Sequence, residues 1–182
     1  MPKPTDFIFV RHGQSQANAN GVVNDGDSPL TALGVEQAKE TARALRSLRF
    51  EAIVCSPLLR ARQTAEIIAN ELGFHRVHIT VISELRERGL GLLEGKPLDR
   101  KPVLYYSDED DALGFESRAA LYERMELCLE ILRPIATKQE TLVVGHSISG
   151  FYLLQIAAKK SSPESFGDPP RMNNASFIKV TI

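Results

Sequence analysis

Short apolar runs rich in strand-forming residues alternate with helical patterns along this chain, and this alternation restricts the fold more than any other feature. The strand-like runs are Phe7–Val10, Ala52–Cys55, His78–Ile82, Thr141–Val144 and Ser176–Thr181. The helical patterns between them cover Thr31–Leu48, Pro57–Leu72, Gly114–Ile135 and Ile148–Ala158. Strands that alternate with helices favour a largely parallel sheet with helices on its faces. We therefore predict an α/β fold, a three-layer α/β/α sandwich with a mostly parallel central sheet.

Length and charge restrict the domain count and the partners. The 182 residues suffice for one substantial core, so we expect a single domain over residues 1–182. A net charge of −1 gives no global basic field, so we expect neither a nucleic acid nor a membrane as partner. No apolar run approaches the roughly 18 residues of a membrane span, and the N-terminus lacks the pattern of a signal peptide. Cys55 and Cys128 lie in apolar patterns and are interpreted as buried thiols, which favours the cytoplasm.

Two local patterns carry further expectations. Ser56 is predicted to be the N-cap of the second helix with Pro57 as its first residue, because the proline nitrogen needs no helical partner there. The stretch from Gly95 to Asp111 lacks periodicity and ends in an acidic run. It is interpreted either as a lid beside a site or as a solvated surface loop, and the pattern alone does not separate the two.

Charged and polar residues follow the ends of four predicted strands. The carboxyl ends of parallel strands meet at one edge of a sheet, where ligands of open α/β folds bind. Each residue alone has an ordinary interpretation, such as a polar loop, a helix start, a surface charge pair or a core histidine. Their joint placement at four strand ends instead predicts one cleft. In chain order these residues are Arg11 and His12, Ser56 and Arg60, Glu87, and His146.

The predicted cleft has the residue types that phosphoryl transfer requires. Arginine guanidinium groups match phosphate oxygens in a bidentate manner. A neutral imidazole with one anchored nitrogen can attack phosphorus with the other, and the carbonyl of Gly13 is a candidate anchor for His12. A carboxylate such as Glu87 can donate a proton to the leaving oxygen and then activate water. We expect no metal ion and no other cofactor.

These residues lie in motifs that resemble those of the histidine phosphatase superfamily, also called phosphoglycerate mutase-like. The resemblance runs through nearly the whole chain, with the motifs in the family's order. Two departures are Gln14, where members usually carry Glu, and Ser147, where they commonly carry Gly. The matching blocks are Phe9–Ser15 with Asn18, Asp27–Gly34 with Gln37, Ser56–Ala65, Leu85–Gly95, Gly114–Ser117, Val143–His146 and Asn174–Ser176.

The resemblance implies a role for each matching residue. His12 would be the nucleophile that forms a phosphohistidine, and Glu87 would be the general acid and base. The phosphoryl group would be held by Arg11, Arg60 and His146. Further contacts with the substrate would come from Ser15, Asn18 and Ser147.

The resemblance also implies two reactions from one intermediate. Transfer of the phosphoryl group to water makes a phosphatase, and its return to another hydroxyl of a phosphoglycerate makes a cofactor-dependent phosphoglycerate mutase. Mutases of the family are longer and close over their substrate, so this chain of 182 residues favours hydrolysis of a phosphomonoester. A non-catalytic member that binds a phosphorylated ligand is the remaining alternative. The expected partner is a phosphorylated small molecule, with a phosphoprotein as a further candidate.

Overall fold

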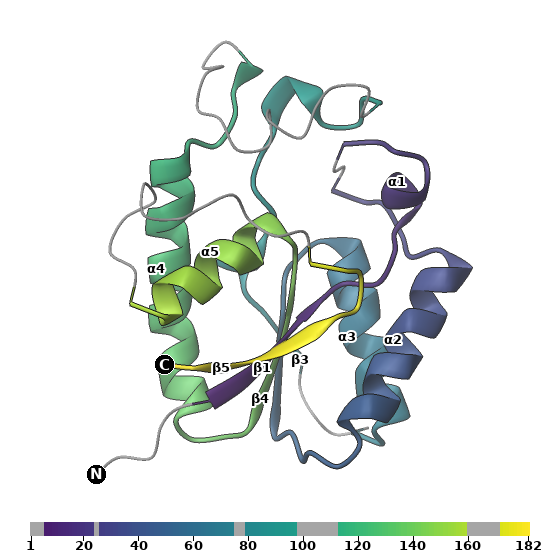
Figure 1. The fold of residues 1–182 in the computed structure, drawn as a ribbon, viewed down its shortest axis with the longest axis vertical. Helices are drawn as coiled ribbons and strands as arrows, with labels where there is room; N and C mark the ends of the chain where they lie inside the picture. The colour runs from purple at the N-terminus through teal and green to yellow at the C-terminus, as the bar shows by residue number, and fades with distance from the viewer. Residues whose placement is uncertain (1–5, 24–25, 75–78, 98–112, 160–171) are drawn as a thin grey trace.

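A single five-stranded sheet forms the centre of the computed structural model, which describes residues 6–23, 26–74, 79–97, 113–159 and 172–182 (Figure 1). The strand order is β3-β2-β4-β1-β5, and β1 to β4 are parallel to their neighbours while β5 runs antiparallel to β1. The bounds are β1 Asp6–Arg11, β2 Ala52–Cys55, β3 Ile79–Val81, β4 Thr141–Gly145 and β5 Phe177–Thr181.

Helices cover both faces of the sheet, which confirms the predicted three-layer α/β/α sandwich. The helices α2 and α3 lie on one face, and α4 and α5 lie on the other (Figure 1). The bounds are α1 Gln16–Ala19, α2 Ala32–Leu45, α3 Leu59–Glu71, α4 Arg118–Ala136 and α5 Ile148–Ala157, with short 3₁₀ helices η1 Ser83–Leu85 and η2 Gly91–Leu93. In the part of the chain that the structure describes, no helix has the length and hydrophobicity that a membrane span needs.

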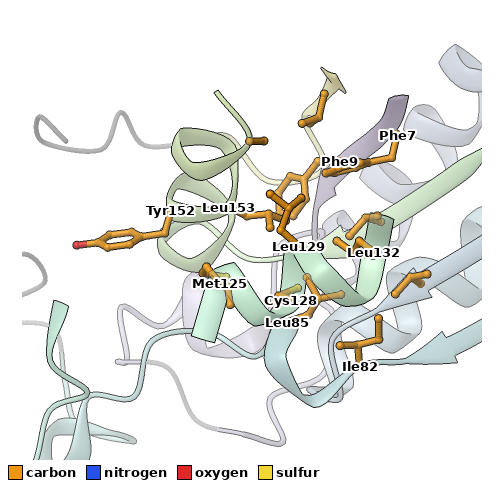
Figure 2. Close-up of a cluster of buried hydrophobic side chains, with 14 of the residues drawn as sticks. Phe7, Phe9, Ile82, Leu85, Met125, Cys128, Leu129, Leu132, Tyr152 and Leu153 are labelled. Atoms are coloured by element: carbon orange, nitrogen blue, oxygen red, sulfur yellow. The ribbon is translucent and has the colours of Figure 1, made fainter. Parts of the chain in front are cut away.

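Each face of the sheet has its own hydrophobic cluster. The cluster between the sheet and α4 and α5 is drawn in Figure 2, where Met125, Cys128 and Leu132 of α4 lie against Phe9 of β1 and Leu85. The central strands are buried on both faces, as is usual for parallel sheets. The packing holds the carboxyl ends of β1, β2 and β4 side by side at one edge of the sheet.

Both cysteines are buried and free, as the sequence predicted. Desolvation by burial is the main cause that raises the pKa of the Cys55 thiol to about 12. It likewise raises the pKa of the Cys128 thiol to about 12. Thiols with such pKa values stay protonated at neutral pH and act as small apolar side chains.

The predicted start of the second helix is wrong. The N-cap of α3 is Leu58 and the helix begins at Leu59, two residues later than expected. The Ser56 hydroxyl accepts from the Leu58 nitrogen at 3.3 Å and also contacts a histidine of the candidate site. This side chain is therefore shared with a distant loop, and α3 has no side-chain cap. Most of the aperiodic stretch from Gly95 to Asp111 lies outside the described residues, so its interpretation as a lid or a surface loop stays open.

Two glycines allow the loop after β1 to lie directly on the start of α2. A Cβ atom on Gly13 would lie 2.4 Å from the carbonyl oxygen of Gly34. A Cβ atom on Gly34 would lie 2.1 Å from the carbonyl oxygen of Gln14. Both distances are shorter than any van der Waals contact, so the close approach of the two backbones requires glycine at both positions. The position of the loop that carries His12 depends on this approach.

Candidate active site

The backbone of His12 is hydrogen-bonded to two other strand ends. Its N–H donates to the carbonyl of Gly145 at the end of β4, at 3.0 Å. Its carbonyl accepts from the N–H of Ala175 at 3.1 Å and from Nδ2 of Asn174 at 3.2 Å, just before β5. The next residue, Gly13, donates its N–H to Oγ1 of Thr64 on α3 at 3.1 Å. His12 is therefore held by three separate segments of the chain.

The ring of His12 has one anchored nitrogen and one that accepts a hydrogen bond. Nδ1 lies 2.6 Å from the carbonyl oxygen of Gly13, which can only accept, so Nδ1 carries the proton. Nε2 accepts a hydrogen bond from Nε of Arg60 at 3.2 Å. This tautomer leaves the lone pair of Nε2 directed at a guanidinium group. It is the state in which an imidazole is nucleophilic.

His146 lies beside His12 in the same buried region. The centroids of the two rings are 5.1 Å apart, and their planes meet at 60°. Nε2 of His146 lies 2.7 Å from Oγ of Ser56, which fixes the orientation of the ring. Nδ1 is buried and has no hydrogen-bond partner among the described residues. A buried polar atom of this kind beside the candidate nucleophile is a suitable contact for a polar ligand.

Two arginines and two histidines are buried together here. The exposed fractions are 6% for Arg11, 3% for Arg60, 3% for His12 and 0% for His146. Desolvation is the main cause that lowers the pKa of both histidines well below 6.5, and the positive charges of Arg60 and Arg11 lower it further. Both imidazoles are therefore neutral at neutral pH. The region combines neutral histidines with fixed positive charge, which suits an anionic ligand.

The two buried histidines make the stability of the protein depend on pH. Their pKa values are depressed in the folded state, so below about pH 6.5 the unfolded chain binds protons that the folded chain does not. We expect the free energy of unfolding to be flat above pH 6.5 and to fall below it by about 1.4 kcal/mol per pH unit for each histidine. Urea denaturation at pH 7.5, 6.5 and 5.5 measures this slope.

His146→Asn provides the control, because it removes one of the two groups and should roughly halve the slope. Glu116, whose pKa lies below 4.5, contributes stability that is lost only at lower pH, outside this window. Equal free energies of unfolding at pH 7.5 and 5.5 would show that the histidines are not buried in the neutral state.

The carboxylate of Glu87 lies at the N-terminus of α5, the helix that begins just after His146 in the sequence. Oε2 accepts from the N–H groups of Ser147 at 3.1 Å and Ile148 at 3.2 Å. Oε1 accepts from the N–H groups of Ser149 at 2.8 Å and Arg88 at 3.0 Å. A helix N-terminus attracts negative charge, and four donors fix both oxygens of the carboxylate. Ser147 thus contacts Glu87 through its backbone, and its side chain does not cap the helix.

Ser15 and Asn18, predicted to contact the substrate, form a capping box at the start of α1. The hydroxyl of Ser15 accepts from the N–H of Asn18, and Oδ1 of Asn18 accepts from the N–H of Ser15, both at 3.2 Å. Oδ1 of Asn18 also accepts from Nδ2 of Asn174, at 3.2 Å, and Asn174 in turn contacts His12. The structure therefore brings both residues next to the His12 loop. Their contact with a substrate stays a prediction.

Sequence reasoning missed two contributors to this region, Thr64 and Asn174. Ser56 was predicted to lie in the cleft because of its position at a strand end, but its contact with His146 was not predicted. Thr64 lies one turn after Arg60 on α3, and this spacing of four residues indicated the same helix face. Asn174 was interpreted only as the start of a strand. The topology could have indicated Asn174. Because β5 runs antiparallel to β1, the residues just before β5 must lie beside the end of β1.

The sequence profile of the histidine phosphatase superfamily (branch 1) matches residues 7–182. A probable phosphoglycerate mutase, GpmB, of Salmonella paratyphi A is 35% identical over 151 residues, which cover 78% of this chain and 69% of the relative.

Two solved structures share the fold. The phosphoglycerate mutase of Bacillus anthracis has a TM-score of 0.80 at 23% identity, over 98% of this chain and 88% of that one. A mycobacterial glucosyl-3-phosphoglycerate phosphatase has a TM-score of 0.79 at 24% identity, over 96% and 90%. At these identities the two structures support the fold alone.

Proposed function

Because the chain belongs to the histidine phosphatase superfamily, whose members are phosphatases or mutases, we propose that it hydrolyses a phosphomonoester through a phosphohistidine on His12. The observation that carries this proposal is the state of the His12 ring. Nδ1 is anchored on the carbonyl of Gly13, and Nε2 is unprotonated and faces Arg60. A buried nucleophile beside fixed guanidinium charge is the arrangement that phosphoryl transfer requires.

In the first step, Nε2 of His12 attacks phosphorus and the bond from phosphorus to the ester oxygen breaks. Glu87, in its protonated form, gives its proton to that oxygen, so the alcohol leaves neutral. Arg11, Arg60 and His146 bind the oxygens of the transferring group and stabilise its charge. Nδ1 of His146, which has no partner among the described residues, supports its part in this binding.

In the second step, water attacks the phosphorus of the phosphohistidine. The Glu87 carboxylate accepts the proton of the water, the phosphorus–nitrogen bond breaks, and inorganic phosphate leaves with the neutral His12 restored. Both steps use the same carboxylate in opposite directions. The carboxylate of Glu87 accepts a hydrogen bond from the N–H of Ser147, the residue that follows His146. This contact supports a role of Glu87 beside the reacting atoms.

The substrate class that we propose is a phosphorylated small molecule. The names of the relative and of the structural neighbours, phosphoglycerate mutase and glucosyl-3-phosphoglycerate phosphatase, both denote such substrates. The two buried free thiols support the cytoplasm, a reducing compartment, as the place of action.

Phosphoglycerate mutase activity is the second candidate function. The identity of 35% with a probable phosphoglycerate mutase favours it. A mutase must keep water away from the phosphohistidine until the phosphoryl group returns to the substrate. The chain has 30 residues between Glu87 and α4, and we take this short length as support for hydrolysis.

Product analysis separates the candidates. We expect the purified protein to release inorganic phosphate from para-nitrophenyl phosphate and from a panel of phosphorylated metabolites, ranked by kcat/KM. With 3-phosphoglycerate, we expect release of phosphate to exceed conversion to 2-phosphoglycerate. If conversion is the faster process, the mutase assignment is correct. If neither occurs and no acid-labile phosphate forms on the protein, the chain is a binding member of the family.

A further inference from the structure

Arg124, in the middle of α4, directs all its hydrogen-bond donors at one segment and one carboxylate. Its side chain is 8% exposed, and a guanidinium group has five N–H donors. Nε and Nη2 donate to Oε1 and Oε2 of Glu116, each at 2.6 Å. The remaining donors bind backbone carbonyls: Nη1 those of Glu84 and Arg86, and Nη2 that of Glu87 at 3.4 Å. Every donor is therefore used.

Glu116 holds the residues on the other side of Glu87. Its Oε2 accepts from the N–H of Gly89 at 3.2 Å, and its backbone N–H donates to the Gly89 carbonyl at 2.9 Å. Its own carbonyl accepts from Nε of the fully buried Arg88 at 2.8 Å. We call residues 84–89 the Glu87 segment. Arg124 binds its carbonyls up to and including that of Glu87, and Glu116 binds the two residues that follow Glu87.

We propose that Arg124 and Glu116 are positioning residues that hold the Glu87 segment, and with it the Glu87 carboxylate, where the proton transfers occur. The inference rests on the proposed function, because it assumes that Glu87 is the acid and base. Neither residue contacts the histidines by a hydrogen bond that the structure shows. Their hydrogen bonds act through the segment that carries Glu87. Desolvation is the main cause that lowers the pKa of His146, and the charge of Arg124, which Arg124→Lys keeps, contributes to it as well.

The ion pair is better suited to fixing geometry than to supplying stability. A buried ion pair loses much hydration energy, so it often contributes less to stability than an apolar pair of the same size. The bidentate fork of Arg124 on Glu116 instead fixes direction. The pair also stays charged at neutral pH. Burial raises the pKa of Glu116, yet Arg124, the Gly89 N–H and Arg86 lower it more, and the net pKa lies below 4.5.

A displaced Glu87 would slow only steps that depend on its proton. Para-nitrophenolate leaves readily without protonation, whereas phenolate needs the proton more. In Arg124→Lys, the charge stays but the fork is lost. We expect kcat/KM for phenyl phosphate to fall about 10- to 100-fold, with a loss below about threefold for para-nitrophenyl phosphate.

Glu87→Gln is the reference variant and should show the same dependence on the leaving group. In its background, Arg124→Lys should cause no further loss, because the two changes then act on one function. Glu116→Gln keeps the side-chain shape and is the second variant, so the inference stays testable if Arg124→Lys folds poorly. Arg133→Lys, an exposed arginine of the same helix, is the matched control and should leave both rates unchanged.

The outcomes separate two failures. Equal losses on both esters in a variant that unfolds at the native temperature, or an additional loss in the Glu87→Gln background, would overturn the positioning role of Arg124 and Glu116. A Glu87→Gln variant that shows no dependence on the leaving group would overturn the role of Glu87 itself, and the positioning role with it. Thermal unfolding of every variant shows whether a loss follows from unfolding, which would also affect both esters equally.

Discussion

His12→Ala is expected to lower kcat for phosphate release by roughly 10⁴- to 10⁶-fold, to near the uncatalysed background. The variant lacks Nε2, the atom that faces Arg60, and alanine offers no other nucleophile. Removing the nucleophile of a covalent enzyme eliminates the whole two-step path, and only binding and electrostatic stabilisation remain. Initial rates with para-nitrophenyl phosphate at saturating concentration measure the loss.

Rapid quenching provides the second measurement for this variant. Native protein mixed with labelled substrate should carry acid-labile, base-stable phosphate, and His12→Ala should carry none. The variant should fold, because the hydrogen bonds from residue 12 to Gly145 and Ala175 are made by the backbone and do not use the side chain. Activity within about tenfold of the native rate would mean that water attacks the substrate directly, without a covalent intermediate.

The sheet and the edge that carries the candidate site could be predicted because they depend on local patterns. An apolar run that stops at a charged or polar residue, as at Arg11 and His146, marks a strand end, and parallel topology places such ends together. The four-residue helix α1 gave no periodic signal, because four residues complete only about one turn.

Contacts between distant residues could not be predicted in the same way. Ser56 and His146 lie 90 positions apart, so the position of Ser56 at a strand end predicts that it lies in the cleft but not which residue its hydroxyl contacts. Arg124 follows Leu121 by three residues and precedes Cys128 by four, so it lies on the buried stripe of its helix. The burial of Arg124 was therefore visible in the spacing, but its partners depend on the tertiary fold.

Arg60→Ala is expected to lower kcat/KM by roughly 10³- to 10⁵-fold, the range that an arginine contributes to phosphoryl transfer when it stabilises the transferring group. Arg60 also acts on the nucleophile. Desolvation is the main cause that lowers the pKa of His12, and the charge of Arg60 is the next. Without Arg60 the pKa of His12 should rise, so more His12 is protonated and inactive in mild acid. The acid limb of the kcat/KM profile should therefore move to higher pH, which pH–rate measurements from pH 4.5 to 8 detect.

Arg62→Ala is the matched control, because Arg62 lies on the same helix with its side chain exposed. It should retain the native rate and the native pH profile. The double effect distinguishes Arg60 from an arginine that only attracts substrate, since weaker attraction would raise KM and leave the acid limb in place. A loss confined to KM, with an unmoved acid limb, would therefore contradict the contact between Arg60 and His12. A loss in kcat with a shifted limb would show that one guanidinium group both keeps His12 neutral and stabilises the transferring phosphoryl group.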